Sequence, residues 1–190
     1  MPPKAKFTKE EIITVALGVV RERGINELTA RALGTALGSS SCPIFTVFKN
    51  MEEVHEAVIE AAKKVYKGYI EKGIPQTPAF QGVGEQYVRF AVEEPNLFKL
   101  LFMSEKEELP EVTGALPLID ESYDKILLSI SDGYDLSKDQ AENIYRHLWV
   151  YTHGIATLCV TKMCKFSPDD IESMTTEVFL SLLKNVKGRK

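Results

Sequence analysis

The chain has 190 residues, of which 44% are hydrophobic and 26% charged, and a formal net charge of −4, which are ordinary values for a globular protein. No apolar run approaches the ~20 residues of a membrane-spanning helix, and the start, MPPKAKFT, lacks the apolar core of a signal peptide. Three cysteines, an odd number, make no disulfide framework, so we expect a protein of the reducing cytoplasm.

Positive charge is concentrated at the N-terminal end of the chain. Residues 1–50 hold seven Lys and Arg against four Asp and Glu, a net charge of +3, whereas residues 51–190 carry −7. A basic head on an acidic body directs the head, rather than the whole protein, towards a polyanion. The excess is mild, so it is informative only beside the helical patterns of the same region.

The first predicted helix follows a basic N-terminal arm made of Lys4, Lys6 and Lys9. Thr8 and Glu11 form a T-x-x-E capping box that opens this helix. Gly24 ends it, as a glycine just past the last helical turn does.

A pair of short helices is predicted over residues 29–48. The first runs from Ala30 to Leu37 and is broken by Gly38. Ser40 can cap the second, which has Pro43 in its first turn, where a missing N–H costs little. Two helices joined by about a three-residue turn form a helix-turn-helix, whose second helix enters the major groove of DNA. Other helical hairpins have the same spacing, so the pattern alone is only moderately specific.

Six further helices are predicted beyond this unit, and no strand pattern appears. They cover residues 50–72, 77–94, 95–103, 113–131, 137–164 and 168–186, with Asn50–Glu53, Ser137–Gln140 and Ser167–Pro168 as start signals and Asp132–Gly133 as a turn. We therefore predict an all-α fold of about nine helices. Residues 1–51 form the helix-turn-helix domain, and residues 52–190 form a helical ligand-binding and dimerisation domain.

The last two predicted helices have more apolar surface than one bundle needs. Apolar residues such as Leu148, Trp149 and Ile155 cover most of the circumference of the helix over residues 137–164, and such a helix must be buried on several sides. Pairing this helix and the helix over residues 168–186 with those of a second copy would give a two-fold homodimer. The alternative is a central helix of a larger monomeric bundle.

The residues of the head resemble a known family. The segment LTARALGTALGSSSCPIFTVFKNMEEV at residues 28–54 resembles the DNA-binding head of the tetracycline-repressor (TetR) family of bacterial regulators. In the body, Trp149, His153 and Gly154 resemble the WHG-like C-terminal domain of some members, and the segment from Pro95 to Phe102 is similar too. The resemblance implies a homodimeric repressor on a palindromic double-stranded DNA operator, released when a small hydrophobic molecule binds the body.

The resemblance also implies which residues contact DNA. The family's contact positions correspond to Thr29, Arg31, Ser40, Ser41, Cys42, Phe45, Thr46 and Lys49. The usual tyrosine, histidine and lysine are replaced by Phe45, Val47 and Met51, so the second helix carries no charge and cannot make the common arginine–guanine contact. We therefore expect hydroxyls to contact bases and the cations Lys4, Lys6, Lys9, Arg31 and Lys49 to contact phosphates, with weaker DNA binding than in a lysine-rich relative. The hydroxyl residues expected at the bases are Ser39, Ser40, Ser41 and Thr46.

An effector pocket is expected in the body, because ligand cavities in helical domains are mostly apolar with a few polar groups. The candidate lining residues are Tyr87, Phe90, Phe98, Phe102, Met103, Tyr123, Trp149 and His153. No metal site is predicted, because His153, Cys159 and Cys164 do not share a helix face, and no cofactor is expected.

Two other functions remain open from the sequence. A small helical enzyme is disfavoured, because the chain lacks a glycine-rich phosphate loop, a serine elbow, a paired carboxylate motif and metal-ligand spacing. A protein-interaction module with a degenerate DNA-binding head stays possible, because the second helix of the pair is uncharged. A non-enzymatic, ligand-responsive repressor is the leading interpretation.

Overall fold

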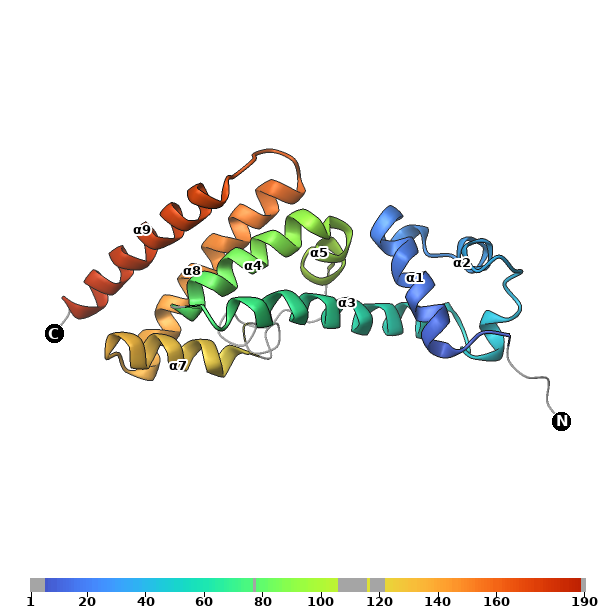
Figure 1. Cartoon of the computed structure of the whole chain (residues 1–190), viewed down its shortest axis with the longest axis horizontal. Coiled ribbons are helices and arrows are strands. Elements are labelled where there is room, and N and C mark those ends of the chain that lie inside the picture. The colour runs from blue at the N-terminus through green and yellow to red at the C-terminus, as the bar shows by residue number, and fades with distance from the viewer. Residues whose placement is uncertain (1–5, 77, 106–115, 117–121, 189–190) are drawn as a thin grey trace. The chain divides into compact units, whose positions relative to one another are not determined.

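The computed structural model describes residues 6–76, 78–105, 116 and 122–188. These residues contain helices, turns and loops but no strand, which confirms the all-α prediction (Figure 1). The helices are α1 (Lys9–Arg23), α2 (Ala30–Ala36), α3 (Met51–Gly73), α4 (Ala79–Glu93), α5 (Pro95–Phe102), α7 (Tyr123–Tyr134), α8 (Lys138–Val160) and α9 (Pro168–Lys187), with two 3₁₀ helices, η1 (Ile25–Glu27) and η2 (Ile44–Thr46). None of the described helices is both long and apolar enough to cross a membrane.

The chain forms two compact units. The head unit comprises Met1–Val65 with Glu94–Ser104, and the body unit comprises Tyr66–Glu93 with Glu105–Lys190. Helix α3 therefore continues from one unit into the other. The predicted division after residue 51 places α5 with the body, whereas the structure groups it with the head unit, because α5 packs against α1.

The head unit is built on a predicted helix start. Thr8 and Glu11 form the expected capping box: the Thr8 hydroxyl accepts the Glu11 N–H at 3.1 Å, and the Glu11 carboxylate accepts the Thr8 N–H at 2.8 Å. Helix α1 then buries Ile12 and Val20 against the rest of the unit. Its end is fixed by Gly24, whose φ of +87° favours glycine.

The second helix of the predicted helix-turn-helix is shorter than expected. Residues 40–48 form no α-helix but the single 3₁₀ turn η2, and Ser40 does not cap it. Two causes act together. Ile44, Phe45, Thr46 and Val47 are β-branched or aromatic residues of low helix propensity. The Thr46 hydroxyl also donates to the Pro43 carbonyl at 2.7 Å, which competes with helix formation.

Helix α8 is the central element of the body unit, where it packs against α4, α7 and α9 (Figure 1). The predicted caps are confirmed: Ser137 with Gln140 opens α8, and Ser167 with Asp170 opens α9. Each pair exchanges two backbone-to-side-chain hydrogen bonds, which satisfies two helix N–H groups at each start.

Two predicted ends in the body are wrong. Asp132 and Gly133 lie inside α7, which ends only at Asp135 with a left-handed φ of +54°. Helix α8 ends at Val160 rather than near residue 164, because Lys162 adopts φ of +60° and the Met163 N–H bonds back to the Leu158 carbonyl at 3.0 Å. The start of the predicted helix over residues 113–131 lies outside the described residues, except for Leu116.

Candidate functional site

The candidate DNA-contacting segment, residues 39–48, passes close to α2. Gly34 is buried in the middle of α2, and a Cβ atom there would lie 3.0 Å from the backbone of Ser40 and of Ser41. The Ser39 N–H bonds to the Gly34 carbonyl at 2.9 Å, and Gly38 turns the chain with φ of +63°. We call residues 39–48 the recognition segment, and Gly34 is the residue that allows its close approach.

The recognition segment leaves most of its predicted contact residues accessible. Ser40, Cys42, Phe45 and Thr46 are exposed, and Phe45 has 44% of its surface free. The buried side of the segment consists of Ile44 and Phe48. The other predicted contact residues here, Ser39 and Ser41, are half-buried.

Helix α2 supplies the next predicted contacts. Thr29 caps it by accepting the Ala32 N–H at 3.1 Å, and its side chain is exposed. Arg31 and Lys49 are also exposed, and neither forms an ion pair with a described residue. Both cations are therefore available to an outside anion.

Two other predicted phosphate contacts are already engaged within the head unit. The Lys6 ammonium donates to the Ser39 hydroxyl at 3.0 Å. The Lys9 ammonium lies 3.6 Å from the Glu53 carboxylate and 5.1 Å from the centre of the Phe48 ring. Lys4 lies outside the described residues.

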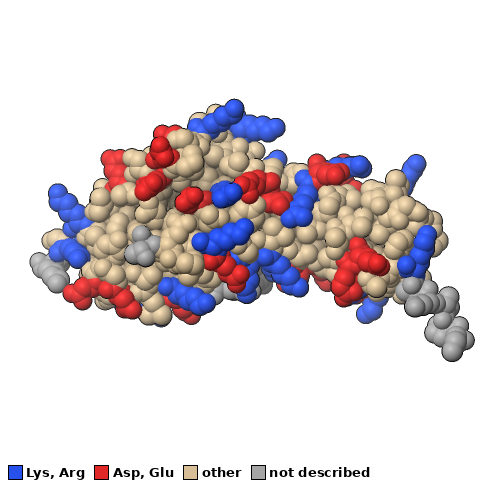
Figure 2. Space-filling model, viewed as in Figure 1, with Lys and Arg blue, Asp and Glu red and all other residues tan. Residues whose placement is uncertain are grey.

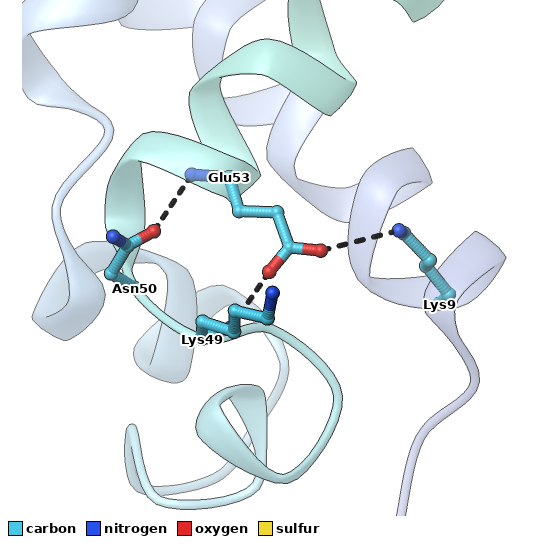
Figure 3. A network of polar contacts seen from close by, with 4 residues as sticks. All are labelled: Lys9, Lys49, Asn50 and Glu53. Carbon is cyan, nitrogen blue, oxygen red and sulfur yellow. Dashed lines mark hydrogen bonds and ion pairs between the residues drawn. The ribbon is translucent and has the colours of Figure 1, made fainter.

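Glu53, which follows the recognition segment on α3, was not predicted as a site residue (Figure 3). Its carboxylate accepts the Lys49 N–H at 2.8 Å, while its own N–H bonds to the Asn50 side chain at 3.0 Å. The Lys49 hydrogen bond, and then the charge of Lys9, hold the pKa of Glu53 below its usual value. Glu53 therefore stays ionised between two of the candidate phosphate-contacting lysines.

Sequence reasoning also missed His55, whose ring Nε2 lies 3.0 Å from the Leu28 carbonyl, just before α2. This hydrogen bond joins α3 to the start of the helix-turn-helix. Neither Glu53 nor His55 matches a motif, although the Asn50–Glu53 capping pattern marks the position of the first. On the face shown in Figure 2, acidic and basic side chains are interspersed and form no extended patch of one sign.

The predicted effector residues fall into separate places. Tyr87 and Trp149 line a cavity of the body unit. Phe98, Phe102 and Met103 belong to the head unit, on or just after α5. The remaining candidates, Phe90, Tyr123 and His153, are in the body unit but do not line this cavity. Phe90 packs on Tyr66 and Tyr69. Tyr123 donates a hydrogen bond to Glu142 at 2.9 Å, and His153 is hydrogen-bonded to Tyr87.

A hydrogen-bonded aromatic group lies beside this cavity. The Tyr87 hydroxyl lies 2.8 Å from His153 Nδ1, and the Trp149 ring stacks on His153 with centroids 5.2 Å apart. Burial raises the pKa of Tyr87 and lowers the pKa of His153. Burial therefore disfavours the charged form of both partners, phenolate and imidazolium alike.

Comparison with known families matches the C-terminal part of the chain, which includes most of the body unit together with α5. The family described as "Tetracyclin repressor-like, C-terminal domain" covers residues 80–182, from α4 into α9. The chain belongs to the tetracyclin repressor-like family. The family expected from the sequence is thus confirmed. In this tetracyclin repressor-like chain the Tyr87–His153 pair and the cavity lining other than Tyr66 lie inside the matched residues, while the recognition segment precedes them. No curated protein sequence gives a significant match to the chain.

The described part of this tetracyclin repressor-like chain holds no cluster of three or more His, Cys, Asp or Glu side chains that could bind a metal ion. Cys42 and Cys164 are exposed and Cys159 is half-buried, and none of the three is in a disulfide. Regulation rather than catalysis is the general role of tetracyclin repressor-like proteins.

Proposed function

We propose that this protein is a ligand-responsive, DNA-binding transcriptional repressor of the cytoplasm. The observation that carries the proposal is the exposed, hydroxyl-rich recognition segment with two exposed cations beside it in the head unit, Arg31 and Lys49, which form no ion pair with a described residue. Exposed cations beside an exposed, hydroxyl-rich segment are suited to contact DNA phosphates. Membership of a regulator family through the body supports the same function.

The proposed contacts divide into two kinds. Arg31 and Lys49 neutralise phosphates, whereas Ser40, Phe45 and Thr46 meet base edges or thymine methyl groups. The segment between Ser39 and Phe48 contains no charged residue, so a bidentate arginine–guanine contact is absent. Each head therefore binds weakly, and its affinity depends on few released counterions.

Two heads acting together would compensate for this weakness, so we propose a homodimer through α8 and α9 on a palindromic operator. Supporting this, α8 has exposed residues at spacings of three and four, namely His147, Val150 and Gly154. Val150 is 53% exposed and Leu180 of α9 is 55% exposed. Exposed apolar side chains on two adjacent helices are typical of a surface that a second copy covers.

Release by a ligand needs differential binding. A small hydrophobic molecule in the body unit lowers DNA affinity only if it binds the DNA-free form more tightly than the DNA-bound form. The reciprocal effect follows, because DNA must then weaken ligand binding by the same factor.

A mobility-shift titration on an inverted repeat from the DNA flanking the coding region tests the proposal. We expect the double variant Arg31→Ala, Lys49→Ala to lose at least tenfold in affinity, because two phosphate contacts are removed. The matched control Lys125→Ala, Lys165→Ala removes two exposed cations from the body and should leave the affinity unchanged.

The recognition segment also favours one alternative, a protein-interaction module with a degenerate head. Its single 3₁₀ turn and lack of charge are unusual for a DNA-reading element. Equal affinity of the double variant and wild type for the inverted repeat would show that the head is not used as proposed. No binding of either protein to the repeat would support this alternative and contradict the repressor.

A further inference from the structure

A small aromatic cavity lies within the body unit, among α3, α4, α8 and α9. It is lined by the rings of Tyr66, Phe80, Tyr87, Tyr145 and Trp149 and has a volume of about 20 Å³. A space of this size holds about one water molecule. It can therefore accept a larger molecule only if its walls move apart.

Two residues of this lining each carry a buried polar atom with no hydrogen-bond partner among the described residues. Thr175 of α9 is only 4% exposed, and its hydroxyl oxygen is buried without a partner. The indole Nε1 atom of Trp149 on α8 is also buried without a hydrogen-bond partner among the described residues. By contrast, the hydroxyl of Thr152, which lines the same cavity, already donates to the Leu148 carbonyl at 2.8 Å.

Buried polar groups in native proteins are normally hydrogen-bonded, and each exception calls for an explanation. A bound molecule with an acceptor atom would satisfy both groups, because an indole N–H can only donate and a threonine hydroxyl can donate. A ligand built only of hydrocarbon would leave both donors unsatisfied, which costs free energy.

A second, larger cavity adjoins the aromatic cavity at Thr175. It has a volume of about 210 Å³, lies between the start of α4 and the start of α9, and shares Thr175 with the aromatic cavity. Gln81 and Glu172, which line it, are joined by a hydrogen bond of 3.0 Å. Separating α4 from α9 here would open a path past Thr175 to the aromatic rings.

The charges along this path select against anions. Glu85 and Glu172 line the larger cavity, and their carboxylates repel a negatively charged ligand. No charged side chain is among the described residues that line the aromatic cavity, so burying an ion of either sign there would be costly.

We propose that the aromatic cavity is the effector site, and that its ligand is a small, uncharged, largely aromatic molecule with a hydrogen-bond acceptor that receives Trp149 Nε1–H and Thr175 Oγ1–H. This assignment rests on the proposed function, in which a small molecule controls DNA binding. It adds the chemical class of that molecule and the two groups that select it.

Three probes with the same number of non-hydrogen atoms test the assignment: acetophenone, which has a neutral acceptor, cumene, which has none, and benzoate, which is an anion. Trp149 is the only tryptophan of the chain, so its indole N–H signal and its fluorescence report on this cavity alone. We expect acetophenone to shift the indole N–H signal and to bind more tightly than cumene by roughly three- to tenfold, the value of one or two neutral hydrogen bonds. Benzoate should bind most weakly.

Variants distinguish the contribution of hydrogen bonds to probe affinity from that of cavity volume. Thr175→Val keeps the shape of the side chain and should narrow the difference in affinity between acetophenone and cumene, because one of the two donors is removed. It should not lower the thermal midpoint of the free protein, because the hydroxyl that is removed is unpaired there. Thr152→Val, the control within the same cavity, should leave the ratio of the two affinities unchanged. Gly84→Ala should weaken both probes, because its Cβ would lie 3.7 Å from Thr152, in ordinary contact, and fill part of the space.

The assignment is overturned if cumene binds as tightly as acetophenone, if Thr175→Val and Thr152→Val have equal effects, or if no probe moves the indole signal up to its solubility limit, which would leave the cavity as a water site. All titrations use the protein without DNA. A protein that binds the inverted repeat but no probe contradicts only the effector site. One that binds acetophenone as expected but no DNA contradicts the repressor and leaves the site in place.

Discussion

The Glu53 carboxylate lies 3.6 Å from the Lys9 ammonium and accepts the Lys49 N–H at 2.8 Å (Figure 3). One acidic side chain on α3 therefore contacts both the first helix and Lys49, the residue that directly follows the recognition segment. It also lowers the positive potential at two lysines that we expect to face phosphates. Stability and DNA affinity thus place opposite demands on this residue.

We predict that Glu53→Gln lowers the thermal midpoint at pH 7 but tightens operator binding by roughly two- to fivefold, the value of one exposed ion pair. The pKa of Glu53 is lower in the folded protein, so its stabilising effect is present above its ordinary pKa and is lost as the pH falls through the lowered value. The difference in thermal midpoint between wild type and variant should accordingly shrink in acid.

The matched control is Glu52→Gln, which removes the same charge from the neighbouring, exposed position of α3. It should leave the thermal midpoint unchanged. Equal shifts of the midpoint for the two variants would show that general charge, rather than the Lys9 and Lys49 contacts, governs the effect.

Gly34 provides a second prediction. Gly34→Ala should destabilise the protein by about 1 to 2 kcal/mol, because its Cβ would press on the backbone of Ser40 and Ser41 and this outweighs the gain in helix propensity. Gly18→Ala in α1 is the control, because its Cβ would meet nothing within 4 Å, and it should be neutral or stabilising. Urea unfolding measures both, and a stabilising Gly34→Ala would contradict the close approach.

His153 makes stability depend on pH. Burial lowers its pKa in the folded protein, so the unfolded chain takes up a proton first, and stability should decline as the pH falls below about 6.5. The free energy of unfolding, measured with urea between pH 8 and pH 5, should therefore fall less steeply with decreasing pH in His153→Phe than in wild type. His147→Gln, on the exposed side of the same helix, should leave the decline in place, and an unchanged slope in His153→Phe would refute the assignment.

The proposed dimer predicts a change of mass. The double variant Val150→Asp, Leu180→Asp places two carboxylates on the exposed faces of α8 and α9, and we expect a monomer in light scattering where wild type is a dimer. Val92→Asp, Leu128→Asp introduces the same charges at equally exposed positions of α4 and α7 and should remain dimeric. A dimer in both variants would place the interface elsewhere.

Local signals made much of this fold predictable. The capping boxes at Thr8, Ser137 and Ser167 are formed by residues three apart, so a single chain segment contains the whole interaction. The starts of α1, α8 and α9 follow directly from them. Helical periodicity gave the remaining long helices in the same way.

Contacts between distant segments were not predictable in this way. Arg21 of α1 forms an ion pair of 2.8 Å with Glu94, and its carbonyl accepts the Asn96 side chain at 2.8 Å. These residues are more than seventy positions apart in the chain, and neither segment carries a pattern that names its partner. The grouping of α5 with the head unit therefore became apparent only from the folded structure.

In the candidate sites, too, local patterns were predictable from the sequence and contacts between distant segments were not. The motif located the recognition segment, but a weak local preference for helix at residues 44–47 decided its 3₁₀ form, and Gly34, a residue of α2, decides how closely it packs. Eight residues, most of them aromatic, were predicted to line an effector pocket. Of these eight, Tyr87 and Trp149 line the aromatic cavity of the body unit. Thr175, which also lines this cavity, was not among the candidates, because a single buried hydroxyl leaves no pattern in the sequence.

The most direct test of the central proposal is the affinity of the wild-type protein for the inverted repeat flanking its coding region, measured against a shuffled sequence of the same composition at one fixed salt concentration. A repressor that uses the recognition segment should bind the repeat at least a hundredfold more tightly, as two protomers for each repeat. Equal affinity for the two sequences, or no binding to either, would contradict the account.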